Sequence, residues 1–570
     1  MCDVHTTGRW AGIPPCNLCV QFALTDGNVG AEHAGMMSVE GVLYLAGMAV
    51  AADVWWRCGV SARLASVGWC ASVRMAKWVA WRWRALPQTF GAARWLLESE
   101  ALRLGLLGVS GVIVGKLGPR LLRFADVEGS VVVFAPQGAG KGVGVVVPNL
   151  LTYAGSVICT DPKGENQAIT ARARRAFGPV YCINVGDPEH SHRFNPMDVI
   201  SRDLLRAVDD CTRLAELLMP KDASEENSHW RDRSVSILTA FLLYVVERCG
   251  EDSERCNLSA VHALVTAPLS VLQDKLKVML TSSQFVVRSE AGLLLNSLEA
   301  DEGRNLLSTM SKGTRIWANG RVLGRLARSS DFDLERDVVG RVATLFVSVP
   351  EDMKAVYTPF MRVMVGLALH AVARVGRNGV GAERPLFMLD EAAALGHIPE
   401  LEDGMGHLRA YARAVIIFQD LGQLQGTYRK WRSLLANAAC QVFFGVNDQD
   451  TAELVSKMLG ERTVEVRSVG VNSGASAVLA HHENAGVGEA GRRLMLPSEV
   501  MRMGPDKAVV FVRGLLQPIL CERVRYFAEK VFDGLWDWWR DGKPAAMVHL
   551  LLEHTPLRLE KKTAAVNASA

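Results

Sequence analysis

Short apolar runs alternate with helix-forming stretches over most of the chain from Val131 onward. Apolar runs of strand length without polar alternation are typical of strands buried on both faces of a parallel sheet. The pattern therefore predicts an α/β domain with a mainly parallel sheet covered by helices. The candidate strands are Val131–Ala135, Val157–Thr160, Pro179–Val185, Leu345–Val349, Leu386–Leu389, Ala414–Phe418, Gln441–Gly445 and Ala508–Val512.

The strand pattern fades between residues 201 and 334, where helix-period segments such as Ser234–Val246 take over. We expect residues 201–334 to form an all-α domain inserted into the α/β domain, which would comprise residues 90–200 and 335–530. Residues 531–570 carry little core-forming pattern and are expected to form a C-terminal tail.

The N-terminal part has a different pattern. Residues 1–35 show no helical or strand periodicity, and we expect a disordered leader there. Gly41–Trp56 is apolar apart from Asp53, although it is shorter than the roughly 20 residues that cross a bilayer comfortably. From Arg57 to Leu97 every ionisable side chain is basic, and tryptophans are interleaved. We therefore expect a membrane anchor and a basic, Trp-rich juxtamembrane segment over 36–89; the alternative is a buried helix followed by a basic surface helix.

The bulk composition suits a globular protein of several domains. The 570 residues exceed one ordinary core, and 49% hydrophobic against 22% charged residues exclude a disordered chain. A formal net charge of +3 indicates no class of partner. The 12 cysteines are scattered without a disulfide framework, and the one CxxC, Cys16 and Cys19, lacks the second half of a zinc site.

The strongest local motif is VVVFAPQGAGKGVGVVVPNLL, Val131–Leu151. A buried strand leads into a Gly-rich turn, a lysine and a helical stretch, which is the layout in which backbone N–H groups cradle a di- or triphosphate. Ala135 replaces the usual first glycine, and Gly142 replaces the usual Ser/Thr, whose hydroxyl binds Mg²⁺. The alternative is an ordinary Gly-rich turn. The expected ATP-binding residues are Ala135, Pro136, Gln137, Gly138, Ala139, Gly140, Lys141, Gly142 and Val143.

A second motif, PLFMLDEAAALG, runs from Pro385 to Gly396 and ends an apolar strand in two carboxylates. In ATPases with a phosphate-binding loop, the first carboxylate holds the Mg²⁺ shell and the second polarises the attacking water. We therefore assign Asp390 to the metal and Glu391, with Lys141, to catalysis. The alternative for Glu391 is a carboxylate favoured by a helix N-terminus.

A third strand, Ala414–Phe418, is followed by Gln419. Ligands of such sheets lie at the carboxyl ends of strands, so this amide could sense the γ-phosphate or orient the water; the alternative is a loop-capping glutamine. Arg409 and Arg413 lie just before this strand, and either could act as an arginine finger towards a neighbouring subunit. We list Arg409 as the catalytic candidate, beside the alternative of a solvated helix face.

These motifs resemble those of the coupling proteins of type IV secretion and conjugation, the TraG/TraD-type DNA-transfer ATPases. The resemblance covers roughly Phe90 to Phe527, and a glycine after the lysine is usual in that family. The other motifs that carry it are GAARW, DPKGEN, SHRFNP, His229-Trp230, SDFDL, IIFQDLGQL, FFGVNDQDTAELVSKMLG, LPSEVMRM and VFVRGLLQPI.

The resemblance implies a ring, usually a homo-hexamer, of RecA-like domains that bind ATP and Mg²⁺. It implies an anchor in the bacterial inner membrane, an ATPase domain in the cytoplasm and an inserted all-α domain that helps to select substrates. The family delivers single-stranded DNA with its bound relaxase, or protein effectors, to components of the secretion channel. Asp161 and Lys163 of the DPKGEN motif would lie near the nucleotide or a subunit interface. The alternatives are another hexameric DNA-pumping ATPase, and a nucleotide-binding docking adaptor without motor activity.

Overall fold

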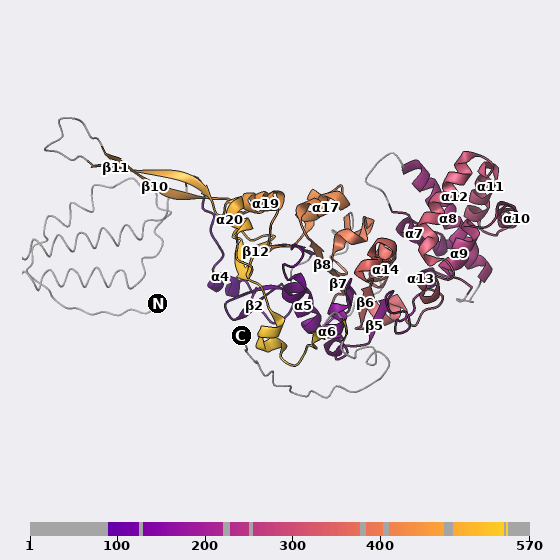
Figure 1. Cartoon of the computed structure of the whole chain (residues 1–570), viewed down its shortest axis with the longest axis horizontal. Coiled ribbons are helices and arrows are strands. Elements are labelled where there is room, and N and C mark those ends of the chain that lie inside the picture. Colours follow the sequence, from indigo (N-terminus) through magenta and orange to yellow (C-terminus); the bar gives the residue numbers. More distant parts are fainter. Residues whose placement is uncertain are drawn as a thin grey trace, which may run out of the picture. The chain divides into compact units, whose positions relative to one another are not determined.

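A computed structural model describes most of the chain after residue 88. The described residues are 89–124, 129–220, 228–249, 255–376, 383–402, 410–471, 483–540 and 543–544. Within them, eleven strands form one sheet in the order β2-β1-β13-β12-β9-β3-β8-β7-β4-β6-β5 (Figure 1). The strands from β9 to β5 in that order are all parallel to one another. They are β3 (Val131–Phe134), β4 (Val157–Thr160), β5 (Val180–Asn184), β6 (Thr344–Ser348), β7 (Leu386–Leu389), β8 (Arg413–Phe418) and β9 (Cys440–Phe443).

The parallel strands are buried on both faces, as their apolar runs predict. Val132 and Phe134 of β3 pack into one hydrophobic core, whereas Val131 and Val133 pack into another, because successive side chains of a strand point to opposite faces. The second core includes residues of α5 and α6, and the first includes residues of α14, α17 and α18. These helices are α5 (Val147–Thr152), α6 (Glu165–Arg174), α14 (Lys354–Gly376), α17 (Leu421–Thr427) and α18 (Trp431–Asn437).

The remaining four strands of the sheet are antiparallel and form one edge. A separate two-stranded hairpin, β10–β11, lies outside the sheet, and most of its side chains alternate in polarity or are glycine. Of these six strands the sequence predicted only β12 at its observed place. They are β1 (Val112–Leu117), β2 (Arg120–Phe124), β12 (Lys507–Val512), β13 (Ile519–Glu522), β10 (Glu461–Val471) and β11 (Glu483–Arg493).

The segment that precedes the first helix pairs with the base of this hairpin. The Ala93 N–H donates to the Glu461 carbonyl at 3.0 Å, and the Thr463 N–H donates to the Gly91 carbonyl at 3.0 Å. A Cβ at Gly91 would lie 2.3 Å from the Glu461 carbonyl oxygen, and Gly91 has a φ of 139°. Glycine is therefore required for this close backbone approach.

Helices fill the chain between β5 and β6 (Figure 1). The predicted helical segment Ser234–Val246 lies inside α8, and in the described residues of this region no strand is found. Gly366 of α14 lies where a Cβ would meet Leu217 of α7 at 2.3 Å, so the two helices approach closely. The helices are α7 (Leu204–Leu218), α8 (Ser228–Cys249), α9 (Leu258–Val265), α10 (Leu269–Met279), α11 (Phe285–Ser297), α12 (Asp301–Thr314) and α13 (Val322–Leu326).

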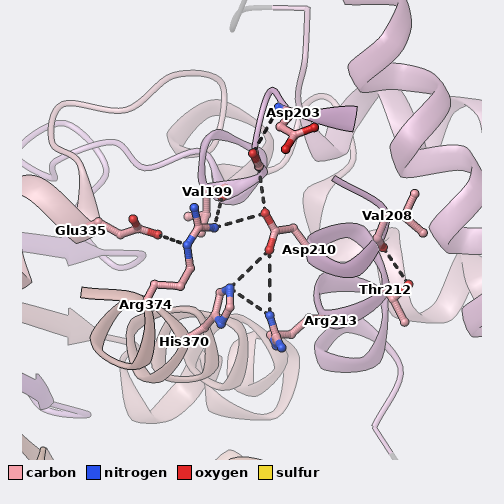
Figure 2. A network of polar contacts seen from close by, with 10 residues as sticks. Val199, Asp203, Val208, Asp210, Thr212, Arg213, Glu335, His370 and Arg374 are labelled. Atoms are coloured by element: carbon pink, nitrogen blue, oxygen red, sulfur yellow. Dashed lines mark hydrogen bonds and ion pairs between the residues drawn. The ribbon is translucent and has the colours of Figure 1, made fainter. Parts of the chain in front are cut away.

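A polar network joins α7 to α14 and to the turn that precedes β6 (Figure 2). Asp210 accepts from the Ser201 backbone at 2.9 Å and lies 3.3 Å from His370 Nε2. Arg374 Nη1 contacts the other Asp210 oxygen at 3.2 Å, and Arg374 Nε contacts Glu335 at 2.9 Å. The Asp210 side chain is only 9% exposed, so a buried charge ties α7 to α14 and, through Arg374, to the turn that precedes β6.

Short helices complete the described part: α4 (Glu98–Arg103), α15 (Pro399–Glu402), α19 (Gln449–Leu459) and α20 (Pro497–Met501). The first residues of the segment predicted as a tail are packed. Phe532 is fully buried, and Arg172 of α6 forms an ion pair with Asp537 at 2.9 Å. The packed structure therefore extends past residue 530.

The predicted leader and the predicted membrane segment Gly41–Trp56 lie outside the described residues. Within the described part, one helical stretch, Glu351–Gly376, is long and apolar enough to cross a membrane. Its most apolar window is 78% buried inside the protein, as expected for a core helix.

Candidate functional site

The predicted phosphate loop follows β3 directly. Residues 135–141 form the loop, and the chain then enters a π-helical turn, Gly142–Val146, that continues into α5. Gly138 and Gly140 have φ values of 79° and 80°, in the left-handed region that favours glycine. The loop therefore has the strand-turn-helix geometry that the motif predicts, with Val143 in the first helical turn.

The sheet order brings the other predicted groups to the same edge. β3 pairs in parallel with β8, β8 with β7, and β7 with β4. Parallel strands that lie in register end at the same edge. Asp161 follows β4, Asp390 and Glu391 follow β7, and Gln419 follows β8, all at the edge where the phosphate loop begins.

Lys141 contacts both predicted carboxylates. Its Nζ lies 3.0 Å from Asp390 Oδ1 and 3.5 Å from Glu391 Oε1. The three side chains are between 12% and 15% exposed, so they form one partly buried cluster. The predicted convergence of an ammonium and two carboxylates at the strand ends is therefore found.

Glu391 has an unusual backbone. With φ 56° and ψ 53°, it is the one non-glycine residue of the described part that has a positive φ. A bulky residue in this region costs roughly 1–3 kcal/mol and is maintained only by its surroundings. Lys354, the first residue of α14, donates to Glu391 Oε2, whereas Lys141 contacts Oε1.

The surroundings shift the pKa values of the two carboxylates in opposite directions. Burial raises the pKa of Asp390, and the Lys141 charge opposes this only in part. Burial would also raise the pKa of Glu391, but the hydrogen bond from Lys354 and the charges of both lysines bring it below its usual value. Environments that separate the pKa values of two neighbouring acids are common in catalytic sites.

Asp161 lies at the start of α6. Its Oδ2 accepts from the Gln167 N–H at 2.8 Å, and its Oδ1 has no hydrogen-bond partner within the described residues. Burial raises the pKa of Asp161 to about 7, against the backbone hydrogen bonds of Gln167 and Asn166. Asp161 thus orders the first turn of α6, whereas the Lys163 side chain is exposed.

The predicted Gln419 immediately follows β8, and its N–H donates to Gln423 Oε1 at 3.0 Å. Arg413 opens β8, so it lies at the opposite edge of the sheet, where it contacts Glu383 at 3.7 Å. The other predicted arginine, Arg409, lies outside the described residues.

Sequence reasoning missed Lys354 and also Arg523, which follows β13. Arg523 Nη1 donates to the Ala139 carbonyl of the phosphate loop, and its guanidinium lies 5.7 Å from the centre of the Phe444 ring. A Cβ at Gly140 would lie 2.4 Å from Arg523 Nη1, so the loop closely fits this side chain. No motif identifies either residue, because Lys354 opens α14 and Arg523 follows β13, both far from the phosphate loop in the sequence.

Over the described part of the chain, no group of three or more His, Cys, Asp or Glu side chains could hold a metal ion. Mg²⁺ usually takes one or two carboxylates and completes its octahedron with waters and substrate phosphates. Asp390, with an oxygen that makes no well-aligned hydrogen bond, fits such a shared site. This donor set suits a nucleotide-bound Mg²⁺ better than a permanent structural metal.

The sequence of the chain matches known proteins over most of its length. A family described as type IV secretory system conjugative DNA transfer matches residues 88–568. Protein VirD4 of Agrobacterium fabrum is 30% identical over 469 residues, which cover 78% of this chain and 67% of that protein. Conjugal transfer protein TraG of Escherichia coli is 26% identical over 494 residues, covering 78% of this chain and 77% of that protein.

The fold also matches solved structures. The bacterial conjugative coupling protein TrwBdeltaN70, in a trigonal form with sulphate, is 18% identical with a TM-score of 0.56. The match covers 78% of this chain and 97% of that chain. The plasmid coupling protein TrwB with the ATP analogue ADPNP gives 18% identity, a TM-score of 0.55, and coverage of 78% and 96%. At this identity the likeness shows a shared fold.

The ordered motifs, the sheet and the family match agree, which confirms the resemblance: the chain belongs to the type IV secretory system conjugative DNA transfer family, whose members are coupling proteins of type IV secretion.

Proposed function

We propose that this chain hydrolyses ATP to deliver single-stranded DNA with its bound relaxase, or protein effectors, to a type IV secretion channel. The observation that carries the proposal is the contact of Lys141 with Asp390 and Glu391 at 3.0 and 3.5 Å. ATPases with a phosphate-binding loop place a lysine, a metal-binding carboxylate and a second acidic group around the outer phosphates.

In this proposal the loop from Ala135 to Val143 binds the phosphates, and Lys141 turns from the carboxylates to the β- and γ-phosphates. Asp390 would hold Mg²⁺, which neutralises charge that develops on the phosphate oxygens. Glu391 would orient the attacking water and accept its proton. Gln419 would sense the γ-phosphate, and Asp161 would support the site from the neighbouring strand.

The RecA-like assignment, the homo-hexameric ring and the inner-membrane anchor belong to the same proposal, as do the domain boundaries. They rest on the family membership and on the apolar and basic pattern of residues 36–89. In a ring, a few loop residues repeated by symmetry would grip the phosphate backbone of single-stranded DNA. We therefore expect binding that ignores sequence and weakens with salt.

The test is ATP turnover by the full-length chain in detergent, with Lys141→Ala and Glu391→Gln beside the wild type. We expect Glu391→Gln to lower kcat by about 10²–10⁴-fold while nucleotide still binds. Lys116→Ala, which removes a lysine paired with Glu529 at 2.6 Å on the antiparallel edge, is the matched control and should keep the wild-type rate. Equal background rates in the wild type and both site variants would reject the motor.

The two alternatives give different results in the same assay. A docking adaptor would bind nucleotide without turnover in any variant. If the chain is a different DNA-pumping ATPase, it would hydrolyse ATP. Its gene would then not restore DNA transfer when it replaces the gene of a coupling protein in conjugating cells.

A further inference from the structure

The position after Lys141 is a glycine that the local structure does not require. Gly142 does not have a positive φ, because it lies in a helical turn. Among the described residues, a Cβ at this position would meet one atom within 4 Å, the Oδ1 of Asn166, at 4.0 Å. A serine would therefore fit, yet the site lacks the hydroxyl that usually follows the lysine and faces an amide oxygen instead.

Asn166 is a largely buried residue whose side-chain amide pairs with no other described residue. The residue is 5% exposed, and the structure shows no hydrogen bond from its side chain to any described residue. Its neighbour Gln167, equally inaccessible at 8% exposure, has its amide oxygen engaged by the Cys182 thiol at 2.9 Å. The Asn166 amide atoms are not among the enclosed unpaired atoms of the described part, so this amide stays accessible to a ligand beside the phosphate loop.

The surroundings hold Asn166 at the same edge as Asp390. Asp161 caps the first turn of α6, in which Asn166 lies. Thr160, the residue before Asp161, donates its hydroxyl to the Asp390 backbone carbonyl at 3.0 Å. The strands β4 and β7, which end at these residues, pair in register. Asp390, at the end of β7, and the first turn of α6, which carries Asn166, therefore follow adjacent strands, and Gly142 faces the Asn166 amide oxygen.

We propose that Asn166 Oδ1 is an oxygen ligand in the shell of the Mg²⁺ that accompanies the nucleotide, and that it replaces the hydroxyl absent at Gly142. This inference rests on the proposed function. Mg²⁺ accepts neutral carbonyl oxygens together with carboxylate and phosphate oxygens. Glycine at 142 then has a clear role, since it leaves the space in front of the Asn166 amide open.

The experiment measures the Mg²⁺ requirement of nucleotide binding to the full-length chain. A fluorescent, non-hydrolysable ATP analogue is titrated in EDTA and at increasing Mg²⁺. For Asn166→Ala we expect the Mg²⁺ midpoint to rise about tenfold or more, the range for losing a group that supports a metal site. Binding in EDTA should be unchanged. Gln167→Ala is the matched control and should keep the wild-type midpoint.

A second pair of variants tests the geometry. Adding Gly142→Ser to Asn166→Ala places a hydroxyl in the space that faces residue 166, and it should return the Mg²⁺ midpoint towards the wild-type value. Asn166→Asp, which keeps the shape and adds a charge, should lower the midpoint. It also provides a measurement if the alanine variant does not fold.

The outcomes separate the two proposals. A wild type that binds no nucleotide at any Mg²⁺ concentration overturns the proposed function. A wild type that binds nucleotide with an Mg²⁺ dependence that Asn166→Ala and Asn166→Asp leave unmoved overturns only the role of Asn166. A midpoint that rises equally in Gln167→Ala would assign the effect to packing of α6 and would also reject it.

Discussion

Two charged clusters of this protein differ in how completely their groups are paired. Around Asp210, each carboxylate oxygen has a partner, and the network closes on itself between α7 and α14 (Figure 2). In the site of Lys141, Glu391 has a strained backbone, and one oxygen of Asp161 and the Asn166 amide have no hydrogen-bond partner among the described residues. A network that only joins elements can satisfy all its groups, whereas a site for a ligand keeps some of them free for it.

The largest effect is expected for Asp210→Ala, which removes the carboxylate at the centre of the fully paired network. Removing the buried carboxylate leaves His370 and Arg374 without it, although Arg374 keeps Glu335 at 2.9 Å. We expect a loss of about 3 kcal/mol in unfolding free energy, the lower end for breaking a buried ion pair. Chemical unfolding followed by fluorescence checks this. Turnover per folded molecule should be unchanged; lost turnover at full stability would assign Asp210 to the site.

At the phosphate loop, Arg523→Ala removes the hydrogen-bond donor to the Ala139 carbonyl. A charge-assisted hydrogen bond is worth about 2 kcal/mol, so the loop should bind nucleotide roughly tenfold or more weakly. Equilibrium titration with a fluorescent nucleotide measures this. Arg525→Ala, which removes an exposed arginine paired with Asp506, is the control. Equal affinities for wild type and Arg523→Ala would show that the loop holds its shape unaided.

A third prediction concerns pH and Asp161. Burial raises the pKa of Asp161 from 3.8 in the unfolded chain to about 7 in the folded one, so the folded state binds the extra proton between these values. The contribution of Asp161 to the free energy of unfolding is therefore largest at low pH. It falls as the pH rises to about 7, by at most about 1.4 kcal/mol per pH unit. Asp161→Asn removes this dependence.

Unfolding of wild type and Asp161→Asn at pH 5, 6, 7 and 8 measures the difference. The unfolding free energy of Asp161→Asn, relative to the wild type, should increase by about 1 kcal/mol between pH 6 and 7. Above pH 8 this difference should stay constant. A gap that stays constant with pH would mean that Asp161 is ionised in the folded protein throughout.

The smallest effect is expected for Lys354→Met. Without the hydrogen bond from Lys354, the pKa of Glu391 should rise, so the acid limb of the kcat/KM profile should move to higher pH. The rate at pH 8 should stay within about tenfold of the wild type, because Glu391 is ionised there. Lys354→Arg, which keeps a donor, should leave the profile in place. An unmoved limb in Lys354→Met would exclude Glu391 as the titrating base.

The parallel strands and the core of the site could be predicted because their signals are local. The apolar run of β3, the glycines and Lys141 are contiguous in the sequence, and the same holds for β7 with its two carboxylates. Lys354 and Arg523 could not be found, because only the strand order brings the residues after β6 and β13 to this loop. Asn166 belongs to a recognised motif, but only the space at Gly142 suggests its role.

The β10–β11 hairpin was missed for a different reason. β10 begins with the polar residues Glu461, Arg462 and Thr463, so it lacks the apolar run by which the parallel strands were identified. Its pairing with β11 runs in continuous register from Glu461–Arg493 to Val471–Glu483.

The pairing of Gly91 and Ala93 with β10 has a mechanical consequence. A pull on the chain ahead of Thr89 would load the hydrogen bonds of Thr89 and Phe90 to the hairpin and then the Thr463–Gly91 and Ala93–Glu461 hydrogen bonds. Load would then pass into the hairpin base before it reached the strands that carry Lys141 and Asp390. Gly91, which alone permits that contact, would be the joint through which the preceding chain pulls on the rest of the protein.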